Sequence, residues 1–483
     1  MKNASLSLAM RWLDRLIGLV SVLVLARILS PDDFGVIAIA SLVIGFVDII
    51  LDLGVNVALI QNDKATREHY DTAWTLRLIQ SVLACAILVA GAPLAGDYFN
   101  NPGAVPVLQW MSLGLPLSSL ENIGVVDFQK KMRFGLDLRF VLTKRLVGFL
   151  VTLAAAWMLR SYWALVIGAL SGRAFGVLLS YAMHSMRPRL GLQKFQEVFS
   201  VSQWMLVRNI GTYLDNNLHK MLVGRWFPSA TLGTYSLADE ISAMPSTEIL
   251  APLNRVLFPA FVQVKENLVE LKRVFLLAQA MQTLIGIPAG VGLAVVAHDA
   301  VLLLLGEKWL AAVPFVQLLG LANVASAIGT SGGYLMVTLG RTKAFALLSW
   351  AKTCAFVLMV LVTGVAANAA DIAVMRLCAG LFGLVVTLWM VMRALENLRL
   401  AEIAGLVARP LLGSVAMAYV VDLLFGAAGD LPVLAALTLE IGTGVLVYSG
   451  TVIALWIVSG RPEGAESWLV RKAGLRRPGL EAN

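Results

Sequence analysis

ARILSPDDFGVIAIA, residues 26–40, has a counterpart 198 positions later in GRWFPSATLGTYSLA, residues 224–238. An arginine, a glycine and an alanine coincide at the same relative positions in the two stretches. A second pair, GAVPVLQWMSLGL at 103–115 and AAVPFVQLLGLAN at 311–323, shares a proline and a glutamine at an offset of 208. The two matches have the same order and nearly the same spacing, which indicates an internal repeat of about six helices.

The chain outside these stretches is strongly apolar. Of its 483 residues, 59% are hydrophobic and 14% charged, and the mean hydropathy is +0.80. This composition is typical of a membrane protein that crosses the bilayer many times. At roughly 20 residues per crossing, the apolar runs predict about fourteen spans, centred on residues 8–29, 36–58, 74–95, 105–125, 139–159, 162–183, 203–224, 232–262, 274–296, 313–339, 344–366, 371–392, 407–425 and 433–458. The first run lacks a small-residue cleavage site, so we expect a retained span.

The basic residues predict the orientation. The net charge is +8, but lysine and arginine form no sustained basic block, so we expect no nucleic-acid partner. With the N-terminus inside, inner loops and tails carry about 23 of them and outer loops about 3. Both termini are therefore predicted to be cytoplasmic. Each of the three cysteines falls in an apolar run, which argues against a disulfide framework.

Repeat and spans together predict the fold class and its division. We expect an all-α polytopic membrane protein with two homologous six-helix lobes, residues 1–195 and 196–395. Residues 396–483 add two helices and a basic cytoplasmic tail. Because six is an even number, both lobes have the same orientation in the membrane. Parallel repeats of this kind build alternating-access carriers with a site between the halves.

Several motifs resemble a known family. LARILSPDDFGVIAIASLVIGFVDIILDLGVNVALIQ, residues 25–61, resembles the N-terminal signature of bacterial polysaccharide and O-antigen flippases. These belong to the polysaccharide transport family of the multidrug/oligosaccharidyl-lipid/polysaccharide exporter superfamily. The resemblance covers about residues 5–400 and continues through DFQKKMRF, LGTYSLADEI, NRVLFPAF and LGEKWLAAVPFVQLLGL. These motifs are mostly structural and identify no binding residue, so the candidate sites below rest on physical arguments.

The resemblance implies a function and its partners. The family moves undecaprenyl-diphosphate-linked oligosaccharide repeat units from the inner to the outer leaflet of the bacterial inner membrane, for surface polysaccharide or exopolysaccharide synthesis. Its fold is two six-helix lobes around a central cavity, with two extra C-terminal helices in some members. The implied partners are the lipid-linked oligosaccharide, inner-membrane lipids and a polymerase of the same pathway.

A polar stripe marks the seventh span, whose sequence includes NIGTYLDNNLHKMLVG, residues 209–224. Arg208, Thr212, Asp215 and His219 are spaced i, i+4, i+7 and i+11, so they share one helix face. Such a face in a membrane helix is expected to line a cavity or the interior of the bundle. His219 is a candidate for proton coupling, although a histidine in a bundle is more often a hydrogen-bonded packing residue.

The eighth span adds further charges to the candidate cavity. Its three prolines, each seven residues from the next, predict a kinked or broken helix, which is typical of segments bordering transport sites. A salt-bridged stripe that holds the bundle together is the alternative for both spans. The charged candidates of the eighth span are Asp239, Glu240, Glu248 and Arg255.

The remaining candidates are cations that an anionic diphosphate would require. Arg11 and Arg15, with Asp14 beside them, form a patch near the inner end of the first span; snorkelling to the cytoplasmic surface explains them equally well. Arg77 and Lys144 lie within the third and fifth spans. Lys352 lies within the eleventh. For any one of these cations, a structural ion pair explains the residue as well as a ligand contact does.

Two other function classes stay open. A multidrug antiporter of the same superfamily would need an acidic cavity, but the intramembrane charges are about 12 basic to 10 acidic. A membrane-embedded glycan polymerase or ligase usually has a larger outer loop than the roughly 15 residues found here. The sequence has no P-loop, zinc-ligand spacing or nucleophile elbow. We therefore expect no enzyme activity, cofactor or metal, while coupling to H+ or Na+ is left open.

Overall fold

The computed structural model describes residues 16–51, 59, 65–198, 203–364, 367–395, 398–425, 432–462 and 464–472. Regular structure in these ranges is helical, and no strand occurs among them. The chain divides into two compact units, Met1–Ser236 and Leu237–Asn483, called unit 1 and unit 2 below. The predicted lobes are defined by the sequence repeat, whereas the two units are defined by packing. The lobe boundaries therefore stay a prediction.

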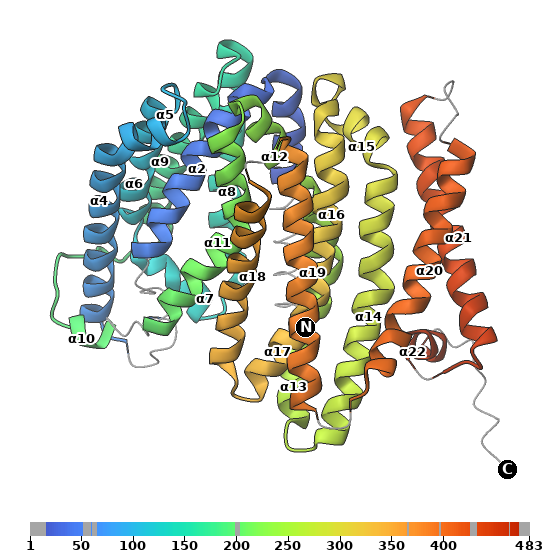
Figure 1. Cartoon of the computed structure of the whole chain (residues 1–483). Helices are drawn as coiled ribbons and strands as arrows, with labels where there is room; N and C mark the ends of the chain where they lie inside the picture. Colours follow the sequence, from blue (N-terminus) through green and yellow to red (C-terminus); the bar gives the residue numbers. More distant parts are fainter. Residues whose placement is uncertain are drawn as a thin grey trace. The chain divides into compact units, whose positions relative to one another are not determined.

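Unit 1 combines long apolar helices with several short ones (Figure 1). An apolar helix over Leu16–Ile28 precedes them. The other helices of unit 1 are α2 (Pro31–Leu51), α4 (Arg67–Tyr98), α5 (Ala104–Ser112), α6 (Gly114–Ser119), η1 (Ile123–Val125), α7 (Val126–Lys130), α8 (Phe134–Leu159), α9 (Trp163–Met183), α10 (Phe195–Val198), α11 (Gln203–Trp226) and the first part of α12 (Ser229–Ser242).

Unit 2 continues from α12. The C-terminal pair α20 and α21 pack against each other, and α20 packs along α14 (Figure 1). After α12, its helices are η2 (Pro245–Leu250), α13 (Ala251–Val264), α14 (Leu268–Val295), α15 (Ala297–Leu304), η3 (Glu307–Ala312), α16 (Val313–Ile328), α17 (Thr330–Thr338), α18 (Thr342–Thr363), α19 (Ala369–Ala394), α20 (Leu400–Phe425), α21 (Val433–Val458) and α22 (Ala465–Lys472).

The described residues contain 9 helical segments long and apolar enough to cross a membrane. Two shorter apolar helices, Leu16–Ile28 and Leu347–Thr363, accompany them. The many-span architecture is therefore present, while the count of about fourteen stays a prediction. The eighth predicted span is an interrupted helix, in which the π-helical turn η2 separates α12 from α13. Such turns are frequent at functional sites.

Each of the two stretches in the first repeat match contains the start of a helix, and the two starts are equivalent positions. α2 begins at Pro31 and α12 at Ser229, which differ by the 198 positions of the sequence offset. The helices touch at their matched glycines: a side chain on Gly35 would overlap the Ser229 carbonyl, and one on Gly233 the Pro31 carbonyl. Two helices approach this closely only where side chains are absent. The repeat is thus visible as a contact between equivalent positions.

Prolines inside two helices of unit 2 free backbone carbonyls, and neighbouring helices bind them. Pro288 of α14 has no N–H, so the carbonyl four residues earlier loses its helical partner. Tyr448 of α21 donates its hydroxyl to that carbonyl, on Leu284, at 2.6 Å. Likewise Pro410 of α20 frees the carbonyl of Leu406, and the hydroxyl of Thr283 donates to it at 3.1 Å. In lipid no water can satisfy these carbonyls, so the two bonds tie α20 and α21 to α14.

Candidate functional site

Five ionisable side chains from five segments of unit 1 interact within the predicted spans. Arg77 and Arg173 each interact electrostatically with Asp48 and Glu121, and Glu121 also pairs with Lys144. They are called the unit-1 charge cluster below. Because charged side chains inside a membrane cost about 2.5–3.5 kcal/mol each on insertion scales, such a group marks a functional site or an ion-pair network. Its members are Asp48 of α2, Arg77 of α4, Glu121 after α6, Lys144 of α8 and Arg173 of α9.

The centre of the cluster is a short ion pair. Nζ of Lys144 lies 2.7 Å from Oε1 of Glu121. The Glu121 side chain is 6% exposed and that of Lys144 31% exposed. Gly176 of α9 makes room for the pair, because a Cβ there would lie 2.7 Å from Oε1 of Glu121 and overlap the Lys144 chain. The lysine therefore reaches an accessible surface while its partner stays buried.

The two arginines are positioned by α6. Arg77 donates to the Ser118 carbonyl at 3.0 Å, which orients its guanidinium towards α6. Arg173 lies against Gly114, where any Cβ would overlap the guanidinium. The helix break at Leu113 starts α6 at this glycine. The broken helix thus provides both a carbonyl for one arginine and a gap for the other.

The charge balance of the cluster favours an anionic ligand. Three cations face two carboxylates, and Asp48 is exposed rather than enclosed. A guanidinium offers a planar fork that fits phosphate oxygens, and an ammonium offers a compact charge. The cluster can therefore bind a phosphate-bearing group with its cations while the carboxylates hold those cations in place.

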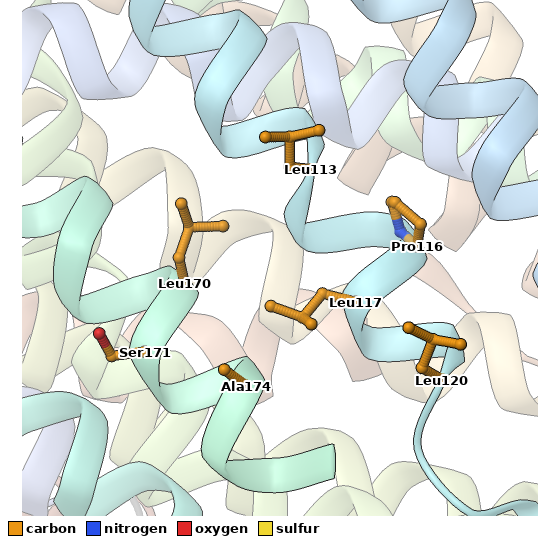
Figure 2. A pocket seen from close by; sticks show the side chains of 7 residues that line it. All are labelled: Leu113, Pro116, Leu117, Leu120, Leu170, Ser171 and Ala174. Atoms are coloured by element: carbon orange, nitrogen blue, oxygen red, sulfur yellow. The ribbon is translucent and has the colours of Figure 1, made fainter.

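An apolar groove of about 480 Å3 lies beside the cluster, between α6 and α9. Figure 2 shows leucines of the α5–α6 segment on one side and α9 on the other. The lining residues are Leu113, Pro116, Leu117, Leu120, Leu170, Ser171 and Ala174. Only Ser171 is polar, so this groove offers hydrocarbon contact and not charge. The polar chemistry of unit 1 lies in the cluster.

The predicted stripe on α11 has a packing partner. His219 is 2% exposed. Its Nδ1 lies 2.9 Å from the Tyr235 hydroxyl, and its Nε2 lies 2.9 Å from the Asn216 carbonyl oxygen. A neutral ring protonated at Nε2 satisfies both contacts. This geometry ties α11 to α12 and fits the packing alternative, while the coupling role stays a prediction. Asp215, on the same helix, is half-buried.

Unit 2 holds the other described candidates. Asp239 of α12 accepts from Asn323 Nδ2 of α16 at 3.4 Å. Glu240 lies next to it near the end of α12, and Glu248 lies in the π-helical turn. Lys352 of α18 runs across Gly383 of α19, where a Cβ would overlap its alkyl chain.

Several predicted residues cannot be placed. Arg11, Asp14 and Arg15 lie outside the described residues. Arg208 and Arg255 fall within α11 and α13, but the placement of their side chains is outside what the structure describes. The proposed roles of these five residues stay predictions.

Part of the unit-1 charge cluster was not predicted from the sequence. Arg77 and Lys144 were selected as candidates, but Glu121 had no predicted role and Arg173 was not among the selected cations. A carboxylate at the end of the fourth apolar run is a signal for an intramembrane partner. The sequence alone does not show that Gly114 and Gly176 open the gaps these side chains need.

Comparisons with known proteins agree with this architecture. A family model described as polysaccharide biosynthesis protein matches residues 24–314, more than half of the chain. The lipopolysaccharide biosynthesis protein WzxC of Escherichia coli is 26% identical over 73% of this chain and 73% of its own length. The succinoglycan biosynthesis transport protein ExoT of Rhizobium meliloti is 27% identical over 63% of this chain and 62% of its own length.

A solved structure has the same fold. The lipid II flippase MurJ in an inward closed conformation matches 95% of this chain and 100% of its own, with a TM-score of 0.76 at 13% identity. At 13% identity, this structural similarity is evidence for the fold and for nothing further. It confirms the predicted fold class, an all-α membrane protein with many spans.

Proposed function

We propose, since the chain belongs to the polysaccharide biosynthesis protein family, that it is a multi-pass membrane transporter for lipid-linked oligosaccharides. It carries repeat units across the bilayer for surface polysaccharide or exopolysaccharide synthesis. Two relatives named for polysaccharide synthesis, one of them a transport protein, support this function. It acts as a transporter and forms no glycosidic bond.

The observation that carries the proposal is the unit-1 charge cluster. Arg77, Lys144 and Arg173 stand inside membrane-spanning helices and outnumber their two carboxylate partners. A carrier for cationic drugs would be expected to show the opposite balance. Cations held on packed helices are what a lipid-linked anion needs in order to leave the head-group region.

The proposed substrate carries its oligosaccharide on an undecaprenyl-diphosphate lipid. The two phosphates would contact the cluster while the polyprenyl chain stays in lipid. Transport would proceed by alternating access, with the two repeat-related lobes rocking about the bound head group. Lys144 is the first contact in this scheme, because its side chain is 31% exposed while that of its partner Glu121 is 6% exposed.

The protein is placed in the bacterial inner membrane, together with a polymerase that acts after it. The asymmetry of lysine and arginine supports insertion in a bacterial inner membrane with both termini in the cytoplasm. A polymerase of the same pathway would consume the translocated repeat units. Cysteines placed in the tails and labelled in intact cells would test the orientation: labelling by an impermeant reagent from outside contradicts it.

A transport assay in vesicles tests the function. Purified protein in liposomes should move a fluorescent undecaprenyl-diphosphate oligosaccharide between leaflets, measured by quenching from outside. Arg77→Met and Arg173→Met should each lower the rate about tenfold to hundredfold, since hydrogen bonds to charged groups contribute about 1.5–3 kcal/mol. Arg273→Met is the matched control, because that arginine is 68% exposed and outside the cluster.

Three outcomes would contradict the proposal. Wild-type vesicles that move no substrate refute transport itself. Wild-type rates in both arginine variants refute the cluster as the diphosphate site. Longer glycans made from lipid-linked donors in the same vesicles would instead establish the polymerase alternative.

A further inference from the structure

A carboxyl group faces an apolar cavity in unit 2. η2, α14, α20 and α21 line a partly open cavity of about 570 Å3, within the usual range of ligand pockets. Its walls include Pro288 and Gly292 of α14 and Met417 of α20. Glu440 of α21 is the one carboxylate among its lining residues. The cavity is distinct from the unit-1 charge cluster.

Glu440 lies at a depth where an ionised carboxylate is costly. α21 has 26 residues and is therefore about 39 Å long, against about 30 Å for the hydrocarbon core. Glu440 follows the first residue of α21, Val433, by seven positions. If α21 is centred in the bilayer, the Cα of Glu440 lies about 6 Å inside the core, and its side chain leans towards the N-terminal end of the helix. At this depth an ionisable side chain is a candidate functional group.

The carboxyl has an unused oxygen. Among the described residues, Oε2 of Glu440 is buried and has no hydrogen-bond partner. Glu440 as a whole is partly exposed, but a carboxyl oxygen buried without a donor is costly while it carries charge. The neutral acid can then lie against the apolar walls of the cavity, whereas the ionised form needs water around it.

A path for the proton leads away from the cavity. α15 packs against α21, and its residues His298 and Asp299 act electrostatically on Glu440. Nδ1 of His298 lies 2.8 Å from Oδ1 of Asp299. His298 is 62% exposed and Asp299 21% exposed. His298 and Asp299 are in direct contact, and both act on Glu440 through space. The three side chains form a His/Asp/Glu series of the kind that relays protons.

The other charged groups near this series are few. The part of α14 that lines the cavity carries no titratable residue. The hydroxyl of Tyr448 on α21 is already donated to Leu284. The remaining titratable or charged groups on adjoining elements are Glu248 on η2, Glu402, Arg409, Tyr419 and Asp422 on α20, and Glu307 and Lys308 on η3 beside α15.

We propose that Glu440 is a proton-binding site connected to the outer surface by His298 and Asp299, and that its protonation couples transport to protons. A proton from outer water passes along the pair and forms an O–H bond on Glu440, converting the carboxylate to the neutral acid. The neutral acid can lie against the apolar walls between α21 and α14, which the Tyr448–Leu284 bond already joins. Proton binding by Glu440 is independent of the proposed function, whereas the coupling of its protonation to transport rests on that function. These two claims are called the proton-binding half and the coupling half below.

Infrared spectroscopy tests the proton-binding half without transport. Purified protein in phospholipid bilayers should show a carbonyl band of a protonated carboxyl at neutral pH. Glu440→Gln should abolish the band, and Glu266→Gln, at an 89% exposed carboxyl, should keep it. Asp299→Asn and His298→Ala should keep the band but slow its hydrogen–deuterium exchange several-fold. An unchanged band in Glu440→Gln overturns the site, and unchanged exchange in both relay variants overturns the path.

The vesicle assay tests the coupling half. Wild-type transport should change several-fold when the outer compartment is acidified, and Glu440→Gln should remove that dependence while keeping the protein folded. A Glu440→Gln variant that loses the infrared band but keeps the wild-type response to pH overturns the coupling. Wild-type vesicles without any transport refute the proposed function and leave the infrared result standing.

Discussion

Single side chains in unit 1 depend on partners from other helices, and the Lys144–Glu121 pair shows this dependence most directly. Removing one member of a fully buried pair costs about 3–5 kcal/mol. The cost here should be smaller, because Lys144 is 31% exposed. Glu121→Gln should lower the unfolding temperature in detergent, and Glu121→Gln combined with Lys144→Met should restore most of the loss. A double variant as unstable as the sum of both single variants would show that the pair is not coupled.

A second stabilising interaction between side chains lies in the connection after α6, outside the predicted spans. Asp127 of α7 accepts hydrogen bonds from Lys131 and from Tyr70 of α4. Burial alone would raise the pKa of Asp127, but these two bonds stabilise the carboxylate more and hold its pKa below the usual value. The ionised aspartate therefore fastens the loop to α4.

The lowered pKa of Asp127 predicts a pH dependence of stability. The contribution is fully present above the unfolded-state pKa of about 3.9 and is lost as the pH falls through the lower folded-state value. Asp127→Asn should therefore unfold at a lower temperature than the wild type at pH about 7. The two curves should converge as the pH falls below about 4. A gap that stays constant or widens in acid contradicts this assignment.

The residues of the candidate site, and the pairs they form, could be predicted from the sequence only in part. Arg77 and Lys144 stand out because a cation in an apolar run is rare and expensive. The pairing of Lys144 with Glu121 was not predictable, because it depends on how α6, α8 and α9 pack around Gly176. For His219, spacing predicts a helix face but cannot reveal that Tyr235 and Asn216 occupy both ring nitrogens.

At the scale of helices, proline positions determine how the C-terminal pair attaches. Tyr448→Phe should leave the Leu284 carbonyl unsatisfied in lipid and cost about 0.6 kcal/mol, the average for interhelical bonds in membranes, and at most about 1.7 kcal/mol. Pro288→Ala restores an N–H for that carbonyl, so Tyr448→Phe should cost almost nothing in its background. Thermal unfolding of the four proteins gives the coupling energy. Equal losses from Tyr448→Phe in both backgrounds would exclude the mechanism.

Thr438→Val is the control for this experiment. Thr438 donates to the Leu434 carbonyl within its own helix, at an exposed position without a proline. Its loss should change stability little in either background. A loss as large as that from Tyr448→Phe would mean that hydroxyl removal from α21 is destabilising in general.

Helices themselves were the most predictable scale. Apolar runs of about 20 residues identify spans because each crossing must satisfy its own backbone. The prolines of the eighth span correctly predicted an interruption, which the structure places at η2. The breaks at Leu113 and Gly329 were not predicted, since glycine and proline occur in uninterrupted membrane helices as well.

At the scale of the whole molecule, the repeat brings equivalent helix starts together. Ser229 donates its hydroxyl to Asp32 beside the Gly35–Gly233 contact. In a background without native cysteines, Asp32→Cys and Ser229→Cys should cross-link under mild oxidation. Adding Gly233→Val should reduce the yield several-fold, because its side chain would overlap the Pro31 carbonyl. Gel mobility measures the yield.

The same cross-link tests alternating access. If transport separates α2 from α12, the oxidised protein should lose transport and regain it on reduction. Full transport by fully cross-linked protein would show that this contact persists through the cycle. An unaltered yield in the Gly233→Val variant would instead mean that the glycines do not set the approach of the helices.

The central claim is leaflet transfer of a lipid-linked oligosaccharide, and its most direct test is the location of that lipid in a strain lacking this gene. An impermeant glycan-modifying reagent, applied to spheroplasts, reports which leaflet holds the repeat units. The account predicts that they accumulate on the inner leaflet, that surface polysaccharide is lost, and that the wild-type gene restores both while the Arg77→Met variant does not. Repeat units that reach the outer leaflet normally in the deletion strain would contradict the claim.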